Sequence, residues 1–350
     1  MSTLFLTSDE TRGLATMDDY VAVVRDGYRE VGGGSPAEPR QKLPNEEPPG
    51  FLTSYLAILE ETGAMGGYTY AAGFGGGDAH FMLPLFDAES GDPLALIDGA
   101  AMNPYKTGAV GGVAADALAR EDADTVAIIG SGPQAKGQLR ALDVVRDIQT
   151  VNVYSRTPEN RESFAASMND ELDASVGAVA SSDAAVEGSD IVVTATSAPK
   201  PVFDGDLLEP GMHVTAMGQY DPAVREVDTQ TVANAKYVPD LRSRAFSDSG
   251  EFLQAREEGV IDDDHIHADL GEILANHAAG RETDEEITLF DSGGTGIETV
   301  AAGYMLYERA SEQGLGQDLE FAPASVWNIC ARKLAWVNWT PLGWPVVPDV

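Results

Sequence analysis

A glycine-rich turn after an apolar run is the strongest chemical signal in this chain. Residues 126–135 are Val-Ala-Ile-Ile-Gly-Ser-Gly-Pro-Gln-Ala, and a helix-like segment follows. This order is typical of a Rossmann unit, in which Gly130 allows the tight turn and Gly132 lets the backbone approach a pyrophosphate. Ala135 lets helix and strand pack closely, and the helix N-terminus favours an anion. The pattern predicts a dinucleotide site that includes Gly130, Ser131, Gly132, Pro133, Gln134 and Ala135.

The end of the next strand bears on which nicotinamide cofactor binds. Residues 153–157 are Val-Tyr-Ser-Arg-Thr, where an NAD enzyme usually places an acidic residue on the ribose hydroxyl. A hydroxyl and a guanidinium suit a 2′-phosphate, so we favour NADP(H), with NAD(H) as the alternative. In that alternative Arg156 is a solvated residue that stacks on adenine. The expected contacts are Ser155, Arg156, Thr157 and Arg161.

Two more strand ends complete the expected cofactor cleft. Residues 192–197 are Val-Val-Thr-Ala-Thr-Ser, so this strand ends in small and hydroxyl side chains. The carboxyl edge of such a sheet is where ligands bind. We expect Ala195, Thr196 and Ser197 to line the nicotinamide ribose, and we assign Gly218 to the same cleft.

The elements that must hold these residues alternate in type. A helix is predicted near residues 17–31, short β-like runs between 51 and 98, and a small-residue helix at 107–120. Strand-like runs then alternate with helical or loop segments, which predicts a parallel sheet with right-handed crossovers. The predicted strands of this sheet are 125–129, 151–154, 191–195, 213–217, 237–240 and 287–291, and a helix at 297–313 follows.

Composition narrows the class of protein. The 350 residues hold 57 acidic and 22 basic side chains, a net charge of −35 that is dispersed along the chain. We interpret this as a halophilic surface, suited to a salt-rich cytoplasm, which argues against nucleic-acid binding. There is no apolar run long enough for a membrane span and no signal peptide at the N-terminus, so a cytoplasmic location is expected.

Few residues are available for metal or disulfide chemistry. The single cysteine, Cys330, excludes an internal disulfide and a multi-cysteine metal site. His265 and His267 lie in an acidic stretch that we interpret as a solvated loop, and His213 as a hydrogen-bonded core histidine, so no metal is expected. The last 24 residues contain all four tryptophans. This tail is predicted either to pack on the N-terminal domain or to form a subunit interface.

Several motifs together resemble the ornithine cyclodeaminase/μ-crystallin family. The blocks that carry the resemblance begin at Thr107 (Thr-Gly-Ala-Val-Gly-Gly), Ile128, Val153, Asp190 and Ile287, and their order matches from about residue 4 to 316. The resemblance implies an α/β fold with a doubly wound Rossmann sheet, and a β-rich α+β substrate and dimerisation domain formed by both chain ends. The implied bounds are 1–118 with 297–350 for the substrate domain and 119–296 for the Rossmann domain. It also implies a homodimer.

The family's functional residues carry over only in part. The resemblance implies that Arg40 grips a substrate carboxylate, and Lys106 stands where the family has a second arginine, next to Thr107. A lysine keeps the charge but loses the bidentate fork.

The family's catalytic residues are replaced in this chain. Tyr68 or Thr69 stands at the position of the catalytic lysine, and Tyr220 at that of the aspartate, with Asp221 one residue later. Tyr68, Tyr220 and Asp221 are the candidate proton donors. Asp221 is equally well explained as a turn residue before Pro222.

These replacements weaken the case for ornithine cyclisation, which needs a base and a group that polarises the imine. Hydride transfer to a preformed C=N or C=O bond needs an aligned nicotinamide, a carboxylate clamp and one proton donor. We therefore favour an NAD(P)-dependent oxidoreductase of a small amino or imino acid. The alternatives are an ammonia-releasing cyclodeaminase and a non-catalytic NADPH-dependent ligand-binding protein.

Overall fold

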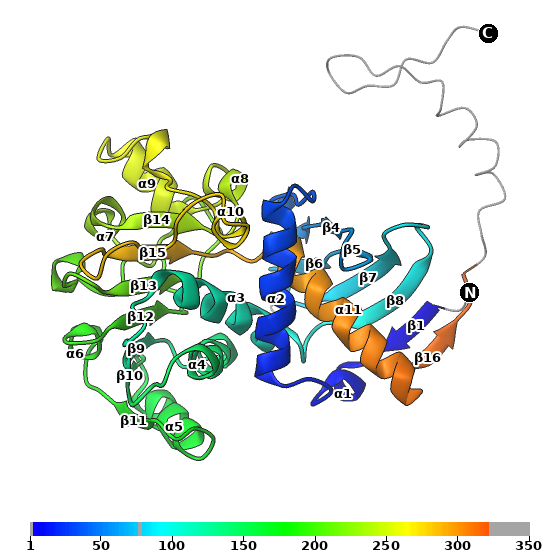
Figure 1. The fold of residues 1–350 in the computed structure, drawn as a ribbon, viewed down its shortest axis with the longest axis horizontal. Coiled ribbons are helices and arrows are strands. Elements are labelled where there is room, and N and C mark those ends of the chain that lie inside the picture. Colours follow the sequence, from blue (N-terminus) through cyan, green and yellow to red (C-terminus); the bar gives the residue numbers. More distant parts are fainter. Residues whose placement is uncertain (1–2, 76–78, 322–350) are drawn as a thin grey trace, which may run out of the picture.

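The computed structural model describes residues 3–75 and 79–321, so the tryptophan-containing tail and Cys330 lie outside the described residues. The described residues form two β-sheets, with helices between and around them (Figure 1). One sheet is parallel and the other is mostly antiparallel. This confirms the predicted α/β class, whereas the exact domain bounds stay a prediction.

The parallel sheet has seven strands in the order β11-β10-β9-β12-β13-β15-β14. Its strands are β9 (Thr125–Ile129), β10 (Thr150–Tyr154), β11 (Ser175–Ala178), β12 (Ile191–Thr194), β13 (His213–Ala216), β14 (Lys236–Pro239) and β15 (Thr288–Asp291). Every residue of β12, β13 and β15 is buried, as expected for central strands of a parallel sheet that is covered on both faces. The strand order reverses at β9, which pairs with both β10 and β12, and this is where such sheets bind ligands.

Short helices connect these strands. They are α4 (Pro133–Val145), α5 (Pro158–Asn169), α6 (Ser182–Val186), α7 (Thr229–Asn234), α8 (Arg242–Ala245), α9 (Gly250–Glu257) and α10 (Leu270–Leu274), with 3₁₀ turns at Gly205–Leu207 and Asp263–His265. Strand β11 was not predicted, because only one of its residues is buried and it therefore carries no apolar run.

The second sheet is built from both ends of the described chain. Its main path is β16-β1-β8-β7-β6-β3-β2, and β5 pairs with both β4 and β7. The strands are β1 (Thr3–Leu6), β2 (Gln41–Asn45), β3 (Gly50–Ser54), β4 (Ala57–Leu59), β5 (Ala64–Gly66), β6 (Thr69–Ala72), β7 (Met82–Asp87), β8 (Pro93–Asp98) and β16 (Gln317–Leu319). Helix α1 (Ser8–Thr11) follows β1, and α11 (Gly296–Gln313) packs on β4, β5 and β7.

Helices α2 (Met17–Gly32) and α3 (Asn103–Leu118) lie between the two sheets (Figure 1). Helix α3 packs closely on α4, as its small residues predicted: a Cβ added to Gly108 would lie 2.2 Å from the carbonyl oxygen of Gly137. The helix begins four residues earlier than predicted, because Pro104 is well tolerated in a first turn. Lys106 is therefore held in the first turn of a helix that packs against the Rossmann unit.

His213 is a core residue, as predicted. It is completely buried, and its ring nitrogens lie 2.9 Å from Thr288 Oγ1 and 3.1 Å from Thr215 Oγ1. Burial, with a smaller effect of Arg281, lowers the pKa of His213 to about 3, so the ring is neutral at physiological pH.

Candidate active site

A cleft of about 630 Å³ lies at the carboxyl ends of β9, β10 and β12. Gly130 has φ +127°, and a Cβ there would lie 2.3 Å from the carbonyl oxygen of Ala195, so only glycine fits this turn. Gly132 is the N-cap of α4 without a side-chain cap, and a Cβ added to it would meet nothing within 4 Å. The free amide groups and the open space suit the pyrophosphate of a dinucleotide.

The residues after β10 line the other end of this cleft. Ser155, Arg156 and Thr157 are among its lining residues. Arg161 is not; its Nη1 donates to the carbonyl oxygen of Ser155 at 2.9 Å and its guanidinium lies 5.5 Å from the ring centre of Tyr154. Arg161 therefore supports the loop that carries Arg156.

A second cavity of about 300 Å³ adjoins the first and shares Gly132, Ala195, Thr196 and Ser197 with it. The remaining walls come from both sheets. They comprise Arg40, Tyr55, Tyr70, Phe81, Asn103, Lys106, Thr107, Pro133, Gln134, Met217, Gly218, Tyr220, Ser292, Gly293 and Gly294. The cavity thus joins the predicted cofactor residues to the predicted carboxylate-binding residues.

Glu226 holds in place part of the wall that these two cavities share. Its buried carboxylate accepts hydrogen bonds from Thr196 N at 2.7 Å, Thr196 Oγ1 at 2.5 Å, Thr194 Oγ1 at 3.1 Å and Gly218 N at 2.5 Å. Burial raises the pKa of Glu226, against the effect of these hydrogen bonds. The side chain of Glu226 thus connects the loop after β12 with the loop after β13 through hydrogen bonds.

Arg40 is held rigidly in the wall of the smaller cavity. Its Nη1 donates to the Tyr70 hydroxyl at 2.5 Å and its Nη2 to the carbonyl oxygen of Gly293 at 2.6 Å. The guanidinium carbon lies 4.5 Å from the ring centre of Tyr55 and 4.2 Å from that of Tyr220. Its side chain is only 3% exposed, so this charge is presented to the cavity in one orientation.

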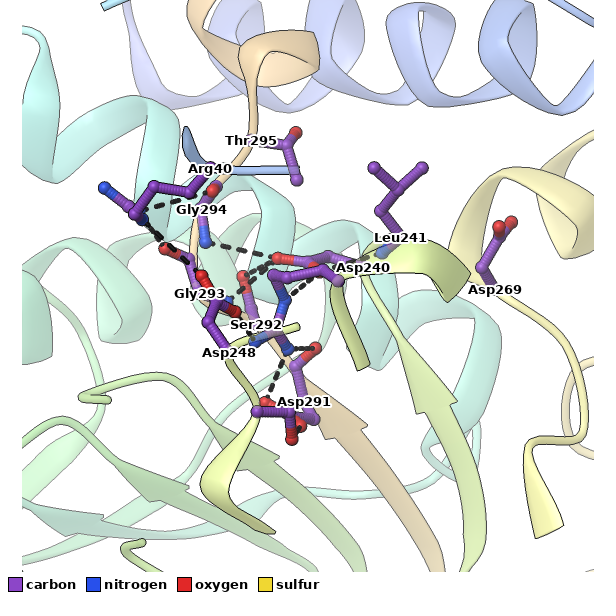
Figure 2. Close-up of polar contacts among 12 residues, drawn as sticks. Arg40, Asp240, Leu241, Asp248, Asp269, Asp291, Ser292, Gly293, Gly294 and Thr295 are labelled. Atoms are coloured by element: carbon purple, nitrogen blue, oxygen red, sulfur yellow. Dashed lines mark hydrogen bonds and ion pairs between the residues drawn. The ribbon is translucent and has the colours of Figure 1, made fainter. Parts of the chain in front are cut away.

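The turn that Arg40 contacts rests on a buried carboxylate. Asp240 Oδ2 accepts hydrogen bonds from Ser292 Oγ at 3.1 Å, Gly293 N at 2.9 Å and Gly294 N at 3.2 Å (Figure 2). Its Oδ1 accepts from Arg244 Nε at 2.5 Å. Asp240 therefore sets the shape of the turn that follows β15.

Arg244 joins that carboxylate to two others. Its guanidinium contacts Asp240, Asp248 at 3.0 Å and Asp291 at 2.7 Å, and it is completely buried. Asp248 also lies 3.7 Å from Arg40 Nε, and Figure 2 shows it between Arg40 and the other carboxylates. This cluster links the conformation of Arg40 to the end of β15.

Lys106 is the second cation of the cavity. Its Nζ donates to Glu298 Oε1 at 3.1 Å, and the two side chains are 2% and 0% exposed. A Cβ added to Gly294 would lie 3.7 Å from Arg40 Nη2 and 4.0 Å from Lys106 Nζ. The two predicted carboxylate-binding residues thus meet beside this glycine, with room for a ligand group. Thr107 lines the same cavity.

Of the three candidate proton donors, only Tyr220 lines the cavity. Tyr68 is completely buried behind the wall, where its hydroxyl donates to the carbonyl oxygen of Gly99 at 3.0 Å. Asp221 is exposed, and its Oδ1 accepts from Ala223 N at 2.9 Å, which is the geometry of a turn. The structure brings neither Tyr68 nor Asp221 into contact with the cavity.

Sequence reasoning missed several supporting residues. Tyr55 and Tyr70 lie in β-rich runs where an aromatic side chain usually indicates core. The Thr295-x-x-Glu298 spacing is a capping-box signal at the start of α11, but nothing in it indicates that Glu298 also binds Lys106. Glu226 and Asp240 lie in loops whose partners are distant in sequence.

No group of three or more His, Cys, Asp or Glu side chains within the described residues is arranged to hold a metal ion. His265 and His267 lie near carbonyl oxygens, at 2.7 Å from Val232 and 2.8 Å from Ala279. No helix in residues 3–75 and 79–321 has both the length and the apolar character that crossing a bilayer requires.

The fold and the joined cavities define a dinucleotide-binding oxidoreductase. The profile of the ornithine cyclodeaminase/mu-crystallin family matches residues 2–314, and the chain belongs to this family. The Δ(1)-pyrroline-2-carboxylate reductase of Bacillus cereus is 39% identical over 241 residues, which are 69% of this chain and 74% of that protein.

Two solved structures are similar along their whole length. The Δ(1)-pyrroline-2-carboxylate reductase of Thermococcus litoralis, in complex with NADH and L-proline, is 34% identical. The match covers 91% of this chain and 100% of that one, with a TM-score of 0.86. An archaeal alanine dehydrogenase dimer with bound NAD is 33% identical, covering 92% and 100%, with a TM-score of 0.86. These findings confirm the resemblance and the oxidoreductase class.

Proposed function

We propose that this protein reduces a small imino acid, in which the carbon of the C=N bond carries a carboxylate, with a reduced nicotinamide dinucleotide. The observation that carries the proposal is the shared wall of the two cavities. Gly132, Ala195 and Thr196 border the cofactor cleft and also the cavity that contains Arg40 and Lys106. A bound cofactor supplies hydride beside the place where a carboxylate is held.

The shape and lining of the smaller cavity favour a compact, partly apolar substrate. Tyr55, Tyr70, Phe81 and Met217 contribute apolar surface to the lining of this cavity of about 300 Å³, and Arg40 and Lys106 contribute positive charge. A five-membered cyclic imino acid, such as the Δ(1)-pyrroline-2-carboxylate for which two relatives are named, has an apolar ring and one carboxylate. This substrate class is supported by a lining that combines aromatic rings with two cations.

For the cofactor we propose NADP(H), with NAD(H) as the competing choice because both similar solved structures hold NAD or NADH. Arg156 lines the cofactor cleft, is exposed, and forms no salt bridge among the described residues. A guanidinium free of a carboxylate partner suits a 2′-phosphate.

We also propose a homodimer adapted to high salt in the cytoplasm. Large apolar side chains are exposed on the second sheet, at Leu43, Leu52 and Met82, and the alanine dehydrogenase relative is a dimer. The dispersed charge of −35 supports the adaptation to salt.

The test is an assay of the protein purified in molar potassium chloride. NADPH or NADH oxidation is followed at 340 nm with cyclic imines, and with keto acids plus ammonia or amines. We expect turnover with a cyclic imino acid. Ammonia release from ornithine without net change of cofactor, or cofactor binding without turnover on any substrate, would contradict the proposal.

A further inference from the structure

The two cations of the smaller cavity differ in what they can do with a proton. A guanidinium keeps its proton at any pH that a protein tolerates, so Arg40 can bind a carboxylate but cannot donate a proton. A lysine ammonium can donate one, and its acidity depends strongly on its surroundings. Lys106 is therefore the cation that can take part in proton transfer.

The surroundings of Lys106 make it more acidic than an exposed lysine. Burial is the largest effect and lowers the pKa of Lys106, and the positive charge of Arg40 acts in the same direction. Glu298 and, more weakly, Asp240 oppose this. Aromatic rings face the ammonium as well, with centres 5.7 Å away at Tyr55 and 5.2 Å away at Tyr68.

The contacts of Glu298 keep its carboxylate ionised beside this ammonium. Burial alone would raise the pKa of Glu298, but Lys106 and Thr295 outweigh it and the pKa is lowered. The carboxylate accepts hydrogen bonds from Thr295 N at 2.7 Å, Thr295 Oγ1 at 2.5 Å and the Tyr28 hydroxyl at 3.1 Å. Glu298 therefore orients one N–H of Lys106 and leaves the other two for a ligand.

Tyr55 and Tyr70, two of the phenols that line the cavity, are weaker acids than an exposed tyrosine. Burial is the largest effect that raises the pKa values of Tyr55 and Tyr70, and the Tyr70 hydroxyl accepts a hydrogen bond from Arg40.

From this arrangement we propose that Arg40 and Lys106 divide the work: Arg40 binds the substrate carboxylate, and Lys106 donates the proton that imine reduction requires. The inference rests on the proposed function. As the imine carbon receives hydride, the π pair of the C=N bond moves onto nitrogen, which takes a proton from Lys106 Nζ. The product is a secondary amine, and the neutral lysine regains its proton from solvent.

Lys106→Arg separates the two roles, because arginine keeps the positive charge and cannot act as the acid. We expect kcat to fall at least about 100-fold, as for loss of a general acid. The KM for the imine and the Kd for the amino-acid product, measured by fluorescence titration, should change less than about threefold. Lys236→Arg, at a partly buried salt bridge to Glu282 and Glu286 outside the two cavities, is the matched control. Wild-type kcat in Lys106→Arg would overturn the proposal.

A variant with a smaller side chain keeps the proposal testable if the Lys106→Arg protein does not fold. Lys106→Ala should lose activity and regain at least tenfold of it with added methylammonium, which can enter the vacated space and supply the proton. The Lys236→Ala variant should show no such response. Absence of rescue in a Lys106→Ala protein that folds and binds cofactor would count against a proton-donating role.

The acidity of Lys106 can be measured without catalysis. The chain has six lysines, so ¹³Cε-lysine labelling gives few NMR signals. The signal that is missing from the Lys106→Arg spectrum is that of Lys106. We expect the titration midpoint of the Lys106 signal to lie below 10.5. The kcat of the wild type should fall above that midpoint, because the ammonium form of Lys106 that donates the proton is lost. Glu298→Gln should move both the titration midpoint of Lys106 and the pH at which kcat falls to lower values, because it removes a carboxylate that stabilises the ammonium form. A midpoint at or above 10.5 would contradict the inference even if the imine substrate proves to be different.

Discussion

The guanidinium of Arg40 donates a hydrogen bond to the carbonyl oxygen of Gly293 at 2.6 Å, across 253 residues of sequence. Arg40 directly precedes β2 of the second sheet, and Gly293 follows β15 of the parallel sheet. The part of the cavity wall that contains Arg40 therefore forms only when the two sheets are packed together.

Substituting Arg40 by lysine tests the carboxylate clamp. Lysine retains one charge but loses the planar fork that contacts Tyr70 and Gly293 together. We expect KM for the imino acid to rise at least tenfold, about 1.4 kcal/mol of binding, with a smaller change in kcat. Steady-state kinetics check this, with Arg29→Lys on the exposed side of α2 as control. An unchanged KM would show that Arg40 does not bind the substrate.

Substituting Asp240 by asparagine tests the support of the 292–294 turn. The substitution neutralises Asp240 in its completely buried ion pair with Arg244. The amide N–H₂ of asparagine then faces N–H donors such as the backbone N–H of Gly293. Losing one partner of a buried pair costs about 3 kcal/mol, so a clearly lower Tm and a raised KM are expected. Differential scanning fluorimetry checks the first, and the exposed Asp18→Asn is the control. A wild-type Tm would mean that the turn is held by other contacts.

Substituting Arg156 by aspartate tests cofactor choice. An exposed carboxylate at this position repels a 2′-phosphate and accepts from a free ribose hydroxyl. We expect kcat/KM for NADPH to fall at least about tenfold and the ratio of NADPH to NADH efficiency to reverse. Both cofactors are compared at one salt concentration, because screening weakens the effect. A wild-type protein that already prefers NADH tenfold would contradict the NADP(H) proposal.

His213 predicts an acid-sensitive core. Its pKa is about 6.5 when unfolded and about 3 when folded, so between these values the unfolded state binds more protons. Stability should therefore fall as pH drops below about 6.5, by up to roughly 1.4 kcal/mol per pH unit from this group. His213→Gln should be less stable at pH 7, because its hydrogen bonds change, yet its Tm should depend less on pH between 6 and 4. Equal pH dependence would exclude this role.

The net charge of −35 predicts dependence on salt. At molar ionic strength the Debye length is roughly 3 Å, so repulsion among dispersed carboxylates is largely screened. We expect Tm to rise by at least about 10 °C between 0.2 M and 3 M potassium chloride. Circular dichroism melts check this, with sodium sulfate as a second salt. A Tm that does not rise would contradict adaptation to high salt.

The cleft proposed for the cofactor is lined by residues that the sequence singled out, because they lie close together in the chain. The turn from Gly130 to Ala135 carries its own conformational requirements, and the strand ends at Ser155 and Ala195 follow from the period of the apolar runs. The order of short apolar strands also predicted the parallel sheet, since strands buried on both faces are continuous apolar segments.

The smaller cavity could not be predicted without the tertiary structure, because its contacts join segments that are far apart in the sequence. The sequence by itself determined a dinucleotide turn, an α/β fold, the family, and Arg40 and Lys106 as candidates. Only the packing decided that Glu298 pairs with Lys106, that Asp240 shapes the turn below Arg40, and that Tyr68 lies behind the wall. A local motif is encoded in backbone requirements at neighbouring residues, whereas the burial and acidity of a side chain depend on everything that packs around it.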